Sequence, residues 1–220
     1  TGELIATVLK EKNEKYVEPE HAPIFIPKSS GDFLWFSEKD GFMNLYRYHQ
    51  SGKLLNKVTN VNWVIQDILG FSSDYKSVIV EGTGKDPREN HAFSFEIGTG
   101  KMRRLTKEPG THRLKLSDDG SMLLDSYSSL KVPKIVAITD VTNSKSKIIH
   151  KAPNPLHKYN HGTTEFLTLK SNDGSELYGR IIKPSNFNIK EKYPVLVYVY
   201  GGPHAQLVTN SWLGGSRLWM

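Results

Sequence analysis

The sequence contains no cysteine, which excludes disulfides, thiol nucleophiles and zinc sites with cysteine ligands. Long apolar runs are also missing, and no stretch approaches the roughly 20 apolar residues of a membrane-spanning helix. The N-terminus, TGELIATVLKEK, does not have the layout of a signal peptide. The composition therefore predicts a globular chain with no membrane span, while the lack of thiols leaves its cellular compartment open.

Basic residues outnumber acidic ones, 29 against 23, which gives a net charge of +6. They are scattered along the 220 residues, and the pair Arg103-Arg104 is the densest point. A nucleic-acid-binding surface needs basic side chains gathered on one face, so we expect no nucleic-acid partner. The chain starts abruptly at Thr1-Gly2 and stops abruptly in WLGGSRLWM, which favours a piece of a longer protein.

Short apolar runs bounded by Gly, Asn, Asp and Ser predict strands and turns over most of the chain. One pattern occurs three times: the end of an apolar strand, a polar turn and then a second apolar strand. It begins at Ile26, Phe71 and Leu116, 45 residues apart each time. Units of about 40 to 50 residues with four strands are typical of β-propeller blades. An ordinary antiparallel sandwich is the alternative, but the matched intervals and turns favour the propeller. A further outer strand is expected over residues 4–9.

The 45-residue repeat ends near residue 162, after the irregular stretch NPLHKYNHG, which predicts a domain boundary there. Residues 165–170 and 176–183 flank an Asn-Asp-Gly turn, which predicts a β-hairpin. The apolar run over residues 195–200 then predicts a strand buried on both faces, as in an α/β sheet. We therefore expect propeller blades over residues 1–162 and the start of an α/β domain over residues 163–220.

Several stretches of the chain resemble one known family. The most specific is KYPVLVYVYGGPHAQ, preceded by DGSELYGRIIKPSNFN, and the propeller segments match more loosely. Together they resemble the dipeptidyl peptidase IV branch of the prolyl oligopeptidase superfamily of serine peptidases. The resemblance covers essentially the whole chain. It implies a mainly β fold in which the C-terminal blades of a β-propeller are followed by the first strands of an α/β-hydrolase domain.

The resemblance also implies a function. Members of this branch are serine exopeptidases that release N-terminal dipeptides, preferably Xaa-Pro, through an acyl-enzyme and without a metal or cofactor. The expected partners are peptides with proline or alanine at the second position, and the expected location is periplasmic or exported. Two alternatives stay open: another branch of the superfamily, such as an acylaminoacyl peptidase or an oligopeptidase, and a propeller binding module without catalysis.

The candidate site residues lie in the turn Tyr200-Gly201-Gly202-Pro203. In the family the matching tyrosine hydroxyl helps to form the oxyanion hole, so the resemblance implies this role for Tyr200 and an active-site turn at Gly201, Gly202 and Pro203. From the residues alone, Tyr200 could instead end a strand with its ring packed and its hydroxyl in water. No G-x-S-x-G elbow occurs in the chain. The nucleophile, acid and base are therefore expected beyond Met220, and the chain is expected to be inactive alone.

The histidines are weaker candidates. His204 follows the turn, but the family places its base further along, so we expect a supporting or solvated side chain. His157 and His161 are four residues apart in a predicted loop with no third ligand nearby, and His112 has no partner at metal-ligand spacing, so we expect no metal. Open strand edges and apolar runs over residues 163–220 predict self-association.

Overall fold

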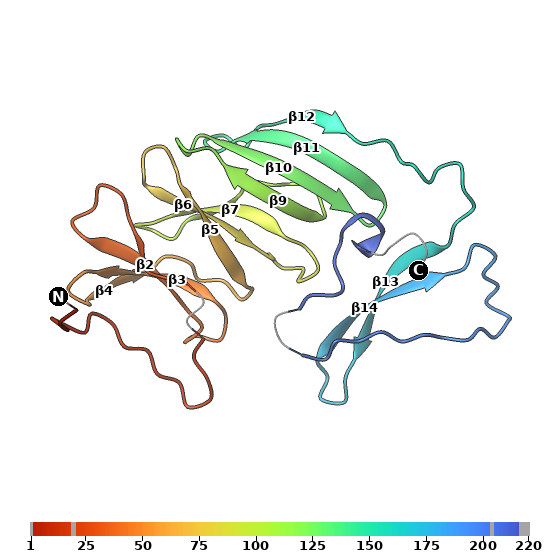
Figure 1. Ribbon diagram of the computed structural model, residues 1–220, viewed down its shortest axis with the longest axis horizontal. Helices are drawn as coiled ribbons and strands as arrows, with labels where there is room; N and C mark the ends of the chain where they lie inside the picture. Colours follow the sequence, from red (N-terminus) through yellow and green to blue (C-terminus); the bar gives the residue numbers. More distant parts are fainter. Residues whose placement is uncertain (1, 19–20, 203–204, 216–220) are drawn as a thin grey trace.

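The computed structural model describes residues 2–18, 21–202 and 205–215 of the chain. Figure 1 shows four-stranded sheets standing side by side in an arc, followed by a separate hairpin. In the part of the chain that the structure describes, the one helix is the short 3-10 element η1 (Trp212–Gly215). No described helix is long and apolar enough to cross a membrane.

Three sheets of four strands form the larger part of the fold, and in each the strands are antiparallel neighbours in chain order. The first contains β1 (Ile24–Phe25), β2 (Asp32–Ser37), β3 (Asn44–His49) and β4 (Leu54–Lys57). The second contains β5 (Ile65–Phe71), β6 (Ser77–Gly82), β7 (His91–Glu96) and β8 (Met102–Arg104). The third contains β9 (Thr111–Leu116), β10 (Met122–Ser129), β11 (Val132–Asp140) and β12 (Ser146–Lys151).

The 45-residue period of the sequence corresponds to one four-stranded sheet per repeat. Phe33, Val78 and Leu123, which the repeat aligns, lie on β2, β6 and β10, the second strand of each sheet. All three side chains are buried. The prediction of four-stranded antiparallel blades is therefore confirmed, and the alternative of an ordinary sandwich is wrong because consecutive sheets are separate units of one chain segment each.

The turns between first and second strands repeat as well. The Ser72 hydroxyl donates to Asp74 at 2.7 Å, and 45 residues later the Ser117 hydroxyl donates to Asp119 at 2.6 Å. Hydrogen bonds from Ser117 and Ser121 lower the pKa of Asp119 to about 2. Short polar side chains that bond to neighbours a few residues away fix a turn locally, which explains why these turns are readable from the sequence.

Stacking of the sheets buries both faces of the second one. Successive side chains of a strand point to opposite faces, and β6 uses both. Val78 and Val80 pack in a core with Leu34 of the first sheet, whereas Ile79 packs in a second core with Leu123 of the third. All five side chains are fully buried. Each contributes about 1.5–3 kcal/mol of apolar burial, so neighbouring blades stabilise one another.

The predicted hairpin is also confirmed. Strands β13 (Thr163–Lys170) and β14 (Glu176–Lys183) pair in full antiparallel register across the Asn-Asp-Gly turn. Between the third blade and this hairpin, residues 152–162 contain no strand. The hairpin forms a sheet of its own and joins none of the blades.

The prediction of a buried strand over residues 195–200 is wrong. These residues have no regular secondary structure, and Val195 and Leu196 are 81% and 94% exposed. A strand forms when a neighbour takes its backbone hydrogen bonds, and in an α/β sheet helices cover its faces. Among the described residues, neither a pairing strand nor a covering helix lies beside this run.

The outer strand expected over residues 4–9 is wrong for the same reason. The segment is irregular, and Leu4 and Ile5 are almost fully exposed. It lies instead along the face of the first sheet, where it borders an apolar hollow with Phe33 and Trp35. The first sheet begins instead with β1, which has only two residues and pairs with β2.

Candidate functional site

The predicted active-site turn lies on the exposed segment that follows residue 194. Tyr200 is 58% exposed, and no described residue hydrogen-bonds with its hydroxyl. Gly201 has φ +67°, a left-handed conformation that favours glycine. A Cβ on Gly202 would lie 2.9 Å from the Tyr200 ring, so both glycines permit this tight turn. Pro203 and His204 lie outside the described residues.

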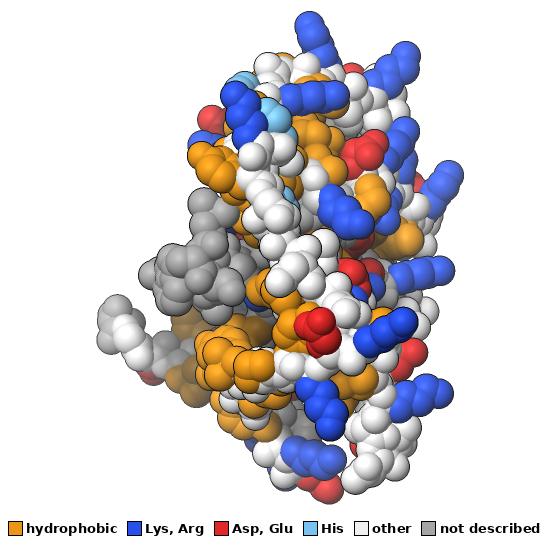
Figure 2. Space-filling view, turned by 90° about the vertical axis from the view of Figure 1, so that its right-hand side faces the viewer, with side chains coloured by type: hydrophobic (Ala, Val, Ile, Leu, Met, Phe, Trp, Pro, Cys, Tyr) orange, Lys and Arg blue, Asp and Glu red, His pale blue; other side chains and the backbone are white. Residues whose placement is uncertain are grey.

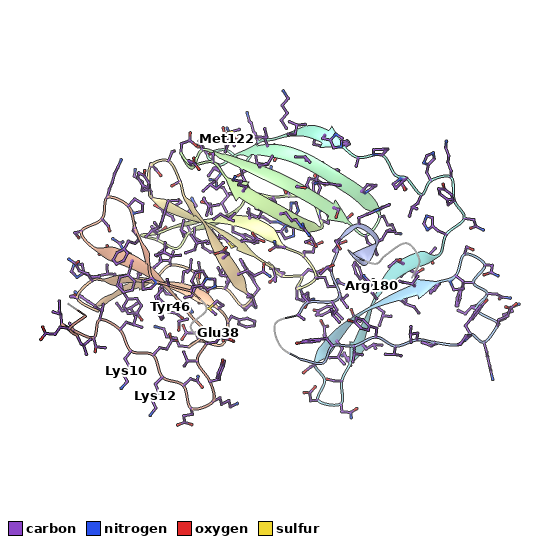
Figure 3. All side chains as sticks on the ribbon, viewed as in Figure 1. Lys10, Lys12, Glu38, Tyr46, Met122 and Arg180 are labelled. Carbon is purple, nitrogen blue, oxygen red and sulfur yellow. The ribbon has the colours of Figure 1, made fainter. Side chains whose placement is uncertain are left out.

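After the turn the chain returns to the propeller. Figure 1 shows η1 between the end of β10 and the hairpin β13–β14. On the propeller side, the Trp212 amide donates to Ser128 Oγ of β10 at 3.0 Å. On the hairpin side, Arg180 of β14 donates to the Gly214 carbonyl, and Figure 3 shows Arg180 on the side of the hairpin toward η1. The segment after the turn is thus hydrogen-bonded both to the propeller and to the hairpin.

Buried polar side chains gather where the second and third blades meet. His91 on β7 and His112 on β9 have ring centroids 4.8 Å apart, and both side chains are about 1% exposed. Their partners are Glu89, Arg104, Thr106, Glu108 and Asp125. Buried polar groups are normally hydrogen-bonded, and the network around these two histidines follows that rule.

His91 accepts at one ring nitrogen and donates at the other. Its Nδ1 lies 3.1 Å from the Thr106 hydroxyl, and its Nε2 lies 2.9 Å from a Glu89 carboxylate oxygen. We assign the proton to Nε2, because the carboxylate can only accept. In the first blade Asn44 and Thr59 occupy the matching positions, with the Thr59 hydroxyl 2.9 Å from Asn44 Oδ1.

His91 makes the stability of the chain sensitive to acid. Burial lowers its pKa, and Arg104 and His112 lower it further, which together outweigh Glu89. The unfolded chain therefore binds a proton below pH 6.5 that the folded chain does not, and stability falls as the pH falls through this window, by up to about 1.4 kcal/mol for each pH unit.

We expect the variant His91→Asn, which places here the residue found in the first blade, to lose less stability than the wild type between pH 7 and pH 5.5. The measurement is the urea unfolding free energy of both proteins at each pH. The other seven histidines are common to both proteins, so the difference between the two pH profiles reports on His91 and the groups that it contacts. Identical pH profiles for the two proteins would contradict the assignment of a neutral, buried His91.

His112 is a buried side chain with hydrogen-bond partners at both ring nitrogens. Its Nδ1 lies 2.9 Å from both Asp125 oxygens, and its Nε2 lies 2.9 Å from the Glu108 carbonyl. Both ring nitrogens therefore lie within hydrogen-bond distance of an oxygen acceptor. The Tyr127 ring stacks on it with centroids 4.7 Å apart. Sequence reasoning missed this pair, although pairing across the Ser117–Ser121 turn places Asp125 diagonally opposite His112.

The other predicted site residues remain apart. His157 and His161 are exposed, and each ring bonds through Nδ1 to a backbone carbonyl at 2.8 Å. In the described part of the chain, no three His, Asp or Glu side chains are grouped as metal ligands would be.

On the face drawn in Figure 2, Lys and Arg side chains extend from top to bottom, mainly in the right-hand half of the view, with acidic and hydrophobic side chains between them. Along the sequence the 29 basic residues are scattered.

Stacked four-stranded antiparallel blades, with both faces of the middle blade buried, define this chain as a segment of a β-propeller. The chain belongs to the family of the dipeptidyl peptidase IV N-terminal region, whose model matches residues 2–134. The resemblance to the dipeptidyl peptidase IV branch is thereby confirmed.

Curated relatives carry related names. The chain is 30% identical to mouse dipeptidyl peptidase 8 over 150 residues, which covers 63% of this chain and 17% of that protein. It is 27% identical to dipeptidyl peptidase 4 of Trichophyton equinum over 190 residues, which covers 82% of this chain and 24% of that protein. The chain therefore spans between about a sixth and a quarter of the length of these relatives.

Solved structures share the fold. A protein described as a dipeptidyl aminopeptidase IV from Bacteroides ovatus matches with a TM-score of 0.85 and 32% identity, over 94% of this chain and 32% of that one. Dipeptidyl peptidase 4 of Porphyromonas gingivalis matches with a TM-score of 0.79 and 26% identity, over 90% of this chain and 28% of that one. Both structures therefore share the fold of most of this chain.

Proposed function

We propose that this chain is part of a serine exopeptidase that releases N-terminal dipeptides, preferably Xaa-Pro, from peptides through an acyl-enzyme. The observation that carries the proposal is the family match over residues 2–134, together with relatives named as dipeptidyl peptidases. Because the chain spans only part of those relatives, the activity is assigned to a longer protein that contains it. Its substrates would be peptides with proline or alanine at the second position.

Residues 163–220 are assigned in this proposal to the start of an α/β-hydrolase domain. Acyl transfer places negative charge on the carbonyl oxygen, and preorganised donors stabilise it. In α/β-hydrolases one such donor comes from the turn after the third strand. Tyr200 would supply a hydroxyl there, and Gly201 and Gly202 leave room for backbone to approach a substrate. The exposed hydroxyl of Tyr200 makes no hydrogen bond to another described residue that would have to break first.

The catalytic triad is assigned to other parts of the parent, because no G-x-S-x-G elbow occurs in this chain. The 220-residue chain is therefore expected neither to hydrolyse Gly-Pro or Ala-Pro chromogenic substrates nor to react with a fluorophosphonate probe. The longer protein should do both. Labelling of any serine in the chain alone would contradict the missing nucleophile, and an unreactive, folded longer protein would favour a binding module.

Self-association is proposed for the chain as studied alone. The exposed apolar run over residues 195–200 and the open edges of the hairpin β13–β14 offer unpaired apolar surface and backbone. Light scattering at high concentration should then give a mass above that of one chain. A strictly monomeric mass would contradict it.

A further inference from the structure

One propeller loop, residues 86–89 between β6 and β7, contacts the hairpin β13–β14. The Arg88 guanidinium lies over the rings of Phe166 and Tyr178, 4.6 Å and 5.1 Å from their centroids. Asp86 holds the guanidinium in place through two hydrogen bonds, at 2.9 Å and 2.8 Å. A guanidinium fixed by a bidentate carboxylate and stacked on aromatic faces is oriented as well as attracted.

The same loop binds the segment that follows the Tyr200 turn, through Asn210. The Asn210 amide donates to the Arg88 carbonyl at 2.7 Å, and its side-chain Nδ2 donates to Glu89 at 2.6 Å. The remaining two polar groups of Asn210 bond to the third blade: Oδ1 accepts from the Leu130 amide at 2.9 Å, and the carbonyl accepts from the Thr111 hydroxyl at 3.1 Å. Asn210 therefore joins two blades with its backbone and its side chain.

Glu89 also makes hydrogen bonds to groups other than Asn210. The oxygen that binds Asn210 also accepts from the Gly110 amide at 3.0 Å, and the other oxygen accepts from His91. Burial alone would raise the pKa of Glu89, but the hydrogen bonds from His91 and Asn210 outweigh burial and lower it. The carboxylate is therefore ionised at neutral pH, and an ionised acceptor makes the stronger hydrogen bond.

We propose that loop 86–89 and Asn210 form an anchor that fixes the C-terminal segment on the propeller, and that Asn210 is a positioning residue for the peptidase reaction. The part that concerns the reaction rests on the proposed function. Asn210 lies ten residues after Tyr200, so the anchor limits where the turn can lie relative to the blades. Oxyanion donors tolerate little displacement, because a shift of about 1 Å can cost about 10²-fold in rate.

Hydrogen exchange on the 220-residue chain tests the anchor itself. In Asn210→Asp the donor to Glu89 is lost and a second carboxylate is placed beside it. We expect backbone amides of residues 208–215 to lose protection by about tenfold. The matched control is Asn188→Asp, since Asn188 lies in the loop after β14 and donates to exposed Glu191 at 3.1 Å. The control should exchange like the wild type.

The double variant Asn210→Asp, Glu89→Gln exchanges donor and acceptor across the contact, and it should recover part of the lost protection. This rescue separates the contact from a general loss of folding, because a merely misfolded chain would gain nothing from a second substitution. Unchanged exchange in Asn210→Asp, or the same loss in Asn188→Asp, overturns the anchor.

Kinetics on the longer enzyme test the positioning role. Asn210→Asp should lower kcat on an Xaa-Pro substrate by about 10- to 100-fold, with KM changed by less than about threefold, and the double variant should restore part of it. Loosened exchange with an unchanged kcat overturns the positioning role. An inactive longer protein that carries no substitution contradicts the proposed function alone, because the exchange experiment reports on the anchor without any activity.

Discussion

Replacing Tyr200 with phenylalanine in the longer enzyme is expected to lower kcat by about 10²–10³-fold, or roughly 3–4 kcal/mol of transition-state stabilisation. The substitution keeps the ring and removes only the hydroxyl. Because an oxyanion donor acts mainly in the transition state, KM should change much less than kcat. The measurement is steady-state kinetics on an Xaa-Pro substrate.

The control for this experiment is Tyr198→Phe. Tyr198 lies two residues earlier on the same segment, is 76% exposed and has no hydrogen-bond partner among the described residues. It should leave kcat within a few-fold. Neither substitution removes a described contact, so the unfolding free energies of both variants should stay within about 0.5 kcal/mol of the wild type. A folded Tyr200→Phe enzyme with wild-type kcat would remove the one catalytic role assigned to this chain.

The variant Asp125→Ala is expected to show the largest loss of stability, about 3–5 kcal/mol. Asp125 and His112 are 4% and 1% exposed, so the His112 ring nitrogen that loses Asp125 is in a buried site. Removing one partner of a buried, hydrogen-bonded pair costs far more than the pair contributes, because the other partner stays buried without compensation. Urea unfolding of the chain measures the loss.

Two further variants separate this pair from a general effect of removing an aspartate. Asp118→Ala changes an exposed aspartate in the turn before β10 and should stay within about 0.5 kcal/mol of the wild type. In a double-mutant cycle, His112→Ala combined with Asp125→Ala should cost less than the two single losses added together. A small loss for Asp125→Ala alone, or strict additivity, would show that the two side chains do not act as a pair.

The propeller was predictable because its signals are local. The turns at Ser72 and Ser117 are closed by side chains two residues away, so their 45-residue spacing marks the blades without knowledge of the packing. The hairpin β13–β14 was predictable for the same reason, since an Asn-Asp-Gly turn sets its own register. Short-range hydrogen bonds of this kind depend on residues that are always close together.

The strands expected over residues 4–9 and 195–200 are absent from the structure, because strand formation also depends on distant parts of the chain. Their apolar side chains satisfy the pattern of a strand, but a pattern does not supply a partner. Both runs lie outside every sheet among the described residues. Apolar character alone therefore predicts that a segment tends to be buried, and the rest of the fold decides whether it is.

The sequence by itself determined the blade repeat, the hairpin, the family resemblance and the turn at Tyr200, because each depends on residues that are neighbours along the chain. The tertiary structure alone decided that Glu89 meets Asn210 and that Arg88 stacks on the hairpin. Glu89 and Asn210 are separated by 121 residues. No short-range pattern relates such positions, and only the packing of blades and hairpin brings them within hydrogen-bond distance.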